Sequence, residues 1–252
     1  MTDRTLHVAT FNIHKGFTHF NVQFALQQQR DLLRKLDADI IFLQEVQELH
    51  LKHPQHAAIA AKTGQLEYLT DQLWPEYAYG KNAVYPAGHH GNALLSKFPI
   101  SKSINQNISA HRLEQRGMLH CEINIPNWST PLHAVCVHFG LLARWRRQQM
   151  QGVVDYVNRY VPKDAPLVIA GDFNDWGVRA DRLFAKQLHV NEVFEHHTGK
   201  HARSFPAWLP MLKMDRIYVR GFDILHAAVH AGPQFMKVSD HALLSAKLVK
   251  RS

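Results

Sequence analysis

Six short polar clusters, each at the end of an apolar run, constrain this chain more than any other feature of its sequence. They read Thr10-Phe11-Asn12, Leu43-Gln44-Glu45, Val137-His138-Phe139-Gly140, Gly171-Asp172-Phe173-Asn174, Met214-Asp215-Arg216-Ile217-Tyr218 and Ser239-Asp240-His241. Each places an Asn, Asp, Glu or His where a buried strand would emerge into a loop. Together they supply hard oxygen ligands and two imidazoles, which predicts one hydrolytic site gathered from across the chain.

Strand-like and helical segments alternate along the 252 residues, which is typical of an α/β domain. We expect helices over residues 22–36, 67–74 and 141–160, with Pro75 and Pro162 stopping the last two. We expect strands over residues 6–11, 39–43, 92–95, 118–125, 132–139, 167–170, 215–219 and 242–248. Loops rich in Gly, Pro, Asn and His are expected over 85–91, 125–131 and 196–210. No Gly/Ser-rich linker or internal repeat divides the sequence, so residues 1–252 are predicted to form one domain of two packed sheets with helices outside.

The composition is that of an ordinary globular protein, with 46% apolar and 20% charged residues. No apolar run approaches the roughly 18 residues that a membrane span needs, and residues 1–6 lack the apolar core of a signal peptide. A cytoplasmic protein is therefore expected. Cys121 and Cys136 lie in strand-like stretches without Cys or His neighbours at zinc spacing, so we interpret them as reduced core residues.

The formal net charge is +8, and 19 histidines add positive charge at mildly acidic pH. This balance favours an anionic partner, such as a nucleic acid, a phospholipid headgroup or another phosphate ester. The densest basic group is Arg144, Arg146 and Arg147 around Trp145. It is either a solvated first helical turn or a phosphate-binding rim, and the sequence leaves both interpretations open. The sequence does not reveal the oligomeric state.

Asp172 and Asn174 stand two residues apart, a spacing that points both side chains to one side of an extended chain. A carboxylate beside an amide suits Mg²⁺ and a phosphate oxygen, although Gly-Asp-Phe-Asn alone is equally typical of a turn after a strand. Glu45 follows a wholly apolar run, where a buried carboxylate needs a cation. A metal ion would meet that need, and the alternative is that Glu45 starts a surface loop.

Asp240 and His241 are adjacent, so they face opposite ways on a strand. We therefore expect Asp240 to face a metal ion and His241 to face the scissile phosphorus. His241 then needs a carboxylate to orient its ring, and Asp215 is the candidate. His138 supplies a second imidazole after a strand; alone it would indicate a structural residue, but the other clusters favour a functional one.

These residue types are the ones that phosphate-ester hydrolysis requires. The reaction needs charge neutralisation on the non-bridging oxygens, an activated water and help for the leaving oxygen. No Gly-x-Ser-x-Gly elbow, Walker loop or Gly-x-Gly-x-x-Gly occurs, and neither cysteine has a base nearby in the sequence. The sequence therefore predicts hydrolysis by water, without a covalent nucleophile.

In this order the clusters resemble the motifs of the endonuclease/exonuclease/phosphatase superfamily, which includes deoxyribonucleases, abasic-site endonucleases, neutral sphingomyelinases and inositol polyphosphate 5-phosphatases. The resemblance runs from Thr10-Phe11-Asn12 to Ser239-Asp240-His241, and Gly171-Asp172-Phe173-Asn174 with the terminal Ser-Asp-His is its specific part. It implies an α/β fold, a four-layered sandwich of two packed mixed β-sheets with helices on both outer faces. It also implies a metal-dependent hydrolase acting on phosphoric ester bonds.

The resemblance implies a metal site and two substrate contacts. Mg²⁺, with Mn²⁺ as an alternative, would be held by Glu45, with Asn12 and Asp240 close by. Arg116 sits where family members often place a substrate contact. Asn92 lies in a segment common in the family, and it would touch the phosphate.

The resemblance also implies the catalytic roles. His241 and Asp215 would form the acid/base pair, and Asp172 would position or deprotonate the attacking water. Asn174 and His138 would bind the phosphate and stabilise the transition state.

The substrate stays open at this point. Abasic-site endonucleases carry an acidic residue where this chain has His14, and their active-site tyrosine segment is not evident, which disfavours abasic-DNA repair. Three motifs are closer to those of the branch with sphingomyelinase-like and lipid-remodelling members: Gly-Asn-Ala-Leu-Leu-Ser-Lys, Val-His-Phe-Gly and a later Phe-Pro. A nuclease and a phospholipid-headgroup hydrolase remain rivals, and a non-catalytic anion-binding module with the same fold is the alternative. A lipid enzyme would need an exposed apolar rim, and the candidate residues, which core packing would explain equally well, are Phe205, Trp208, Leu209, Met211 and Leu212.

Overall fold

Strands dominate the computed structural model, which describes residues 5–17, 25–50, 64–70, 72–85, 88–112 and 114–251. In chain order they are β1 (Thr5–Asn12), β2 (Ile40–His50), β3 (Glu76–Tyr85), β4 (Gly88–Ser96), β5 (Ile100–Asn107), β6 (Gly117–Ile123), β7 (Leu132–His138), β8 (Leu167–Asp172), β9 (Asn191–Glu192), β10 (Asp215–Arg220), β11 (Phe222–His230) and β12 (Leu243–Lys250). They form two mixed sheets of six strands each, in the orders β11-β12-β1-β2-β4-β3 and β5-β6-β7-β8-β10-β9.

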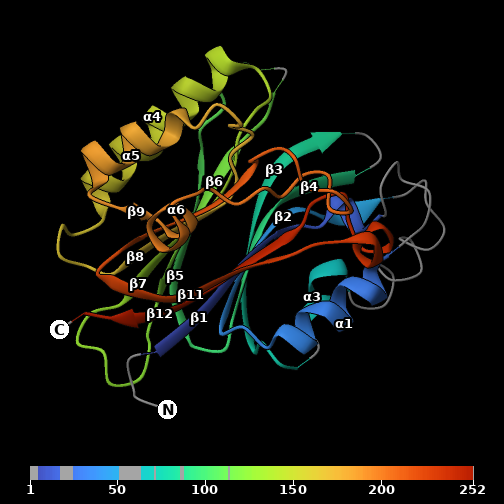
Figure 1. Cartoon of the computed structure of the whole chain (residues 1–252), viewed down its shortest axis with the longest axis horizontal. Coiled ribbons are helices and arrows are strands. Elements are labelled where there is room, and N and C mark those ends of the chain that lie inside the picture. Colours follow the sequence, from blue (N-terminus) through green and yellow to red (C-terminus); the bar gives the residue numbers. More distant parts are fainter. Residues whose placement is uncertain are drawn as a thin grey trace.

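Helices cover the outer face of each sheet (Figure 1). On the first sheet, α1 (Leu26–Leu36) and α3 (Gln65–Thr70) bury leucines against residues of β1 and β2 such as Phe11 and Ile41. On the second sheet, α4 (Ala143–Tyr160) and α5 (Arg179–Leu188) bury Val153, Val157 and Phe184. The shorter elements are α6 (Val193–Thr198), η1 (His14–Gly16) and η3 (Pro233–Lys237). The arrangement is the four-layered sandwich that the sequence predicts.

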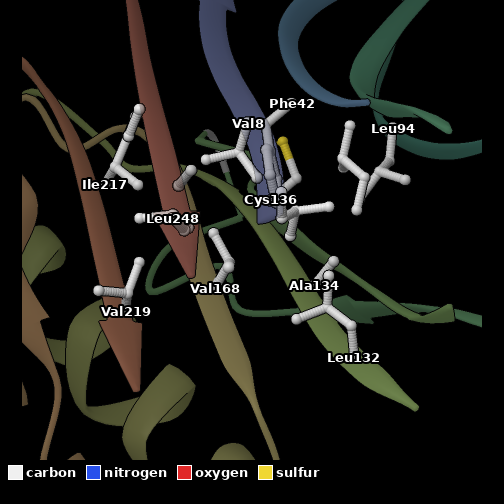
Figure 2. Close-up of a cluster of buried hydrophobic side chains, with 14 of the residues drawn as sticks. Val8, Phe42, Leu94, Leu132, Ala134, Cys136, Val168, Ile217, Val219 and Leu248 are labelled. Atoms are coloured by element: carbon white, nitrogen blue, oxygen red, sulfur yellow. The ribbon is translucent and has the colours of Figure 1, made fainter. Parts of the chain in front are cut away.

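The largest apolar core lies between the two sheets. Figure 2 shows Val8, Phe42 and Leu94 of the first sheet facing Cys136 and Val168 of the second. Alternate residues of each strand point the other way, toward the helices, because side chains alternate across a strand. Close packing of this core fixes the distance between the sheets, and therefore between the polar residues at their shared edge.

The two cysteines are confirmed as core residues. Cys121 and Cys136 are free and buried. Burial raises the pKa of each thiol to about 12, so both stay protonated at neutral pH.

Four strands have no counterpart in the sequence prediction. These are β3, β5, β9 and β11, the four edge strands of the two sheets. β5 is mostly exposed, and its Ser, Lys, Asn and Gln residues give no apolar run. An edge strand buries few side chains, so its pairing is set by the neighbouring strand rather than by its own hydrophobic pattern.

The path of β2 differs from the prediction at one functional residue. β2 continues through Glu45, where its register against β4 shifts between Leu43 and Val46. Glu45 has a φ of 57°, which is the left-handed conformation of a β-bulge residue. Glu45 therefore does not start a surface loop, since it lies in a bulge within a long strand.

Other boundaries shift by a few residues. The predicted loop 85–91 becomes strand from Gly88 onward, and the loop predicted over 196–210 begins inside α6. The helix predicted over 67–74 ends at Thr70, before Pro75. The helix predicted over 22–36 begins at Leu26, while residues 22–24 lie outside the described residues. No helix among the described residues is long and apolar enough to cross a membrane.

Candidate active site

Central strands of both sheets carry the polar clusters to one edge of the sandwich. β7 and β8 run parallel and end at His138 and Asp172, which are register partners. β10 runs antiparallel to β8, so its first residue, Asp215, pairs with Asp172. In the first sheet, parallel β1 and β2 bring Asn12 and Glu45 to the same edge. Residues far apart in the sequence thereby meet.

Asp172 contacts polar residues of both sheets at this edge. Its Oδ2 lies 3.1 Å from Asn12 Nδ2, 3.5 Å from His138 Nε2 and 3.8 Å from His241 Nε2. Its Oδ1 accepts a hydrogen bond of 2.9 Å from the backbone N–H of Asn174. The structure thus places four predicted site residues around one buried carboxylate, that of Asp172.

The environment of Asp172 makes it a weaker acid than an exposed aspartate. Burial raises its pKa, and the nearby Asp215 carboxylate raises it further, while His241 opposes both; the pKa is about 7. A carboxylate with a pKa near neutrality is matched to proton transfer at neutral pH.

His241 is held by a second buried carboxylate. Its Nδ1 donates to Asp215 Oδ2 over 2.9 Å, and Asp215 is fully buried. Burial lowers the pKa of His241, but Asp215 and Asp172 outweigh it and raise the pKa to about 10. The ring centroid of Phe205 lies 5.1 Å from that of the imidazole. His241 is therefore oriented by Asp215, as predicted, and carries a proton at neutral pH.

The predicted metal ligands form a group beside this pair. The Asn12 amide donates to Glu45 Oε1 over 3.4 Å, and Lys15 Nζ lies 3.7 Å from Glu45 Oε2. Burial raises the pKa of Glu45, but the neighbouring His138 and Lys15 outweigh it and lower the pKa to about 2. An ionised, half-buried carboxylate beside an amide fits a divalent cation, because such ions prefer oxygen donors.

Asp240 lies beside His14, a partner that the sequence analysis did not predict. Its Oδ2 lies 3.2 Å from His14 Nδ1, while the Ser239 hydroxyl donates to the Asn12 carbonyl over 2.7 Å and ties this segment to β1. Sequence reasoning missed His14 and Lys15 as partners of the acidic residues. Their position two and three residues after Asn12 is the signal that would have found them, but both need left-handed backbone to reach back, with φ of 47° and 57°.

One possible ligand atom from each of Asp172, Asp215 and His241 lies within 4.8 Å of the other two. Such a set could itself ligate a metal ion. Within this set His241 Nδ1 is already paired with Asp215, so Glu45 is the carboxylate better suited to a cation.

The remaining predicted residues line the same region. The Asn92 amide donates to the carbonyls of Gly117 and Cys136 and so joins β4 to the second sheet. The Asn174 amide donates to the Phe139 carbonyl over 2.9 Å, which orients it after β8. Burial and the nearby Arg116 guanidinium hold the pKa of His138 well below its usual range. His138 is therefore neutral at pH 7.

The arginine cluster of α4 divides into two kinds of residue. Arg146 is buried, donates to the carbonyls of Gly140 and Leu141, and lies 3.8 Å from Asp175. It fixes the loop after β7 rather than standing in solvent. Arg144 and Arg147 are exposed.

Residues 9–241 match the profile of the Endonuclease/Exonuclease/phosphatase family. The chain belongs to this family. A protein named Uncharacterized protein YbhP from Escherichia coli K12 is 42% identical over 241 residues, which are 96% of this chain and 95% of YbhP. The family confirms the predicted resemblance and makes the protein a phosphoester hydrolase of a class that uses a divalent metal ion.

Two solved structures illustrate how widely the fold is shared. A functionally unknown conserved protein from Enterococcus faecalis superposes with a TM-score of 0.78 at 18% identity, covering 98% of this chain and 100% of that one. A mannosyl-6-phosphatase from Bacteroides thetaiotaomicron superposes with a TM-score of 0.71 at 16% identity, covering 97% of this chain and 99% of that one. At these identities the likeness concerns the fold.

Proposed function

We propose that the protein is a Mg²⁺-dependent phosphodiesterase in which a water molecule attacks phosphorus directly. The main support is a carboxylate and an imidazole of different pKa at the sheet edge. Asp172, with a pKa of about 7, lies 3.8 Å from His241, with a pKa of about 10. The carboxylate and the imidazolium are the general base and the general acid that the two proton transfers of phosphate-ester hydrolysis need.

In this mechanism Asp172 Oδ2 takes the proton of the attacking water, and His241 Nε2 gives its proton to the leaving oxygen. Asp215 holds the His241 ring in the orientation that this transfer needs and stabilises its protonated form. His138 is neutral, so its ring N–H donates to a non-bridging oxygen without competing for the proton. Asn174 and Arg116 add a hydrogen bond and a positive charge to the phosphate.

Glu45 would hold the metal ion, with Asn12 and Asp240 close by, and the bound ion would neutralise charge on the phosphate oxygens. Oxygen donors favour Mg²⁺, and Mn²⁺ accepts the same set. Lys15 Nζ lies near Glu45 Oε2, which indicates that the surroundings of Glu45 favour a positive charge.

Among substrates, one observation favours a phospholipid headgroup over a nucleic acid. Trp208, Leu209, Met211 and Leu212 are 41%, 52%, 58% and 39% exposed, and their loop is tied to the site because Ala207 N–H donates to the Asp240 carbonyl over 2.7 Å. Large apolar side chains exposed beside a phosphate site suit an amphiphilic substrate. A nucleic acid stays the rival, supported by the net charge of +8.

The test is Mg²⁺-dependent hydrolysis of a panel by the wild type and His241→Ala. The panel holds plasmid DNA, RNA, phospholipid vesicles, an inositol phosphate, a generic phosphodiester and a sugar phosphate monoester of the kind named for the Bacteroides neighbour. Cleavage of a diester class that is lost in His241→Ala supports the proposal. Cleavage of the monoester alone, or an undiminished rate in a folded His241→Ala protein, contradicts it.

A further inference from the structure

The outer face of the second sheet carries a polar cluster within an apolar layer. On this face Met118, Val135 and Val137 pack against α4. His120 and His133 occupy the same face and are 2% and 4% exposed. A buried polar group in an apolar layer is costly unless it has a partner, so two imidazoles here call for an explanation.

Strand register brings three candidate ligands together. His120 and Glu122 are two residues apart on β6, and Glu122 is the register partner of His133 on β7. One ligand atom from each of His120, Glu122 and His133 lies within 4.8 Å of the others. All three side chains therefore converge on one point of the sheet surface.

The two imidazoles have the separation that a shared metal ion requires. His120 Nε2 lies 3.0 Å from His133 Nδ1. Two nitrogens bound to one tetrahedral Zn²⁺ at about 2.0–2.1 Å stand roughly 3.3 Å apart. A shift of a few tenths of an ångström converts the contact between the rings into a chelating pair.

The rest of the environment completes such a site. Tyr156 Oη lies 3.2 Å from His120 Nδ1 and can accept a hydrogen bond from it, as the partner of a metal-bound histidine does. Glu122 and His133 line a cavity of about 310 Å³, which gives an ion access from solvent. Lys102 Nζ lies 3.3 Å from Glu122 Oε1, but its side chain is 56% exposed and can swing away into solvent.

We propose that His120, Glu122 and His133 form a second metal site, selective for Zn²⁺ over Mg²⁺. Two imidazole nitrogens and one carboxylate are ligands typical of zinc, with a fourth position left for water from the cavity. Imidazole suits zinc and not magnesium, so the two sites differ in metal preference. His133 lies five residues before His138 on β7, which is about 17 Å along a strand, so this site is separate from the catalytic one.

The test is Zn²⁺ binding by the chelator-treated full-length protein in saturating Mg²⁺, followed by competition with a chromophoric chelator. The wild type should bind one Zn²⁺ that Mg²⁺ does not displace. Glu122→Gln and His133→Gln should each weaken this binding by more than the roughly 10–100-fold typical of losing an outer hydrogen-bond partner, and Tyr156→Phe by about that amount. Substituting Co²⁺ should give the intense visible absorption of a tetrahedral site, which His133→Gln abolishes.

Three comparisons keep the result interpretable. Glu45→Gln alters the catalytic edge and should leave this Zn²⁺ affinity unchanged, while Glu122→Gln, at a half-buried position, should leave Mg²⁺-dependent hydrolysis unchanged. His201→Gln removes another histidine held between two carboxylates and should also leave the affinity unchanged. Equal Zn²⁺ affinity in the wild type, Glu122→Gln and His133→Gln, or no retained Zn²⁺ in the wild type, overturns the proposal whatever the outcome of the hydrolysis panel.

Discussion

Replacing Asp215 by Asn tests the proposed acid most directly. Asparagine keeps the size of the side chain but removes the charge that lies 2.9 Å from His241 Nδ1. The rise in the pKa of His241 from 6.5 to about 10 corresponds to roughly 5 kcal/mol. Asp215 is the largest of the groups that raise this pKa, ahead of Asp172 and Asp240, so removing its charge should destabilise the protonated imidazole by on the order of 3 kcal/mol.

That energy shows in the pH at which His241 loses its proton, whereas the loss of an oriented imidazole should lower kcat by roughly 10²- to 10⁴-fold. KM should change little, because Asp215 is buried behind the imidazole and does not face the substrate. The pKa of His241 falls when the carboxylate is lost. The alkaline limb of the rate profile, where the acid loses its proton, should therefore move to lower pH.

The assay is steady-state hydrolysis of the substrate found in the panel, over a range of pH at saturating Mg²⁺. Asp223→Asn is the matched control, since it makes the same change in an exposed pair with Arg251 and should leave kcat unaltered. Equal kcat values and equal alkaline limbs for wild type and Asp215→Asn would refute the assignment of His241 as an acid oriented by Asp215.

Three further perturbations test the metal site, the apolar rim and the fold. Glu45→Gln should raise the Mg²⁺ concentration for half-maximal rate by about tenfold or more, and an unchanged Mg²⁺ titration would argue against Glu45 as a ligand. Trp208→Ser should slow hydrolysis of phospholipid vesicles while sparing a soluble diester, so equal slowing of both contradicts an apolar docking role for the rim. Gly91→Ala would place a Cβ 1.9 Å from the Gly80 carbonyl oxygen and should cost about 1–3 kcal/mol in urea unfolding. Its control, Gly152→Ala, meets nothing closer than 3.8 Å within α4 and should stabilise by about 0.5–1 kcal/mol.

Local sequence was enough to predict the strand ends that carry the site. An apolar run followed by a polar cluster marks both a buried strand and its exit, so Asn12, His138 and Asp172 were located without knowledge of the tertiary structure. Their mutual distances depend on the packing of two sheets, and the sequence gives no such distances. The resemblance to the family supplied the expectation that they meet.

Features that depend on backbone detail escaped prediction. The bulge at Glu45 and the left-handed turn of His14 and Lys15 are set by register against neighbouring strands and by contacts with acidic residues elsewhere in the chain. A one-residue irregularity leaves almost no trace in a hydrophobic pattern. For the same reason, the pairing of Asp240 with His14 could not be predicted from the sequence.

The division between central and edge strands explains why the proposed site was more predictable than the fold around it. The catalytic edge is built from β1 and β2 of the first sheet and β7, β8 and β10 of the second, all flanked by strands on both sides. Such strands are buried on both faces, and this burial produces the apolar runs from which the polar clusters stand out. β3, β5 and β11 are edge strands without such runs, and none of them supplies a proposed catalytic residue. Chemistry that needs buried charges is held where packing is tightest, and tight packing leaves the clearest pattern in a sequence.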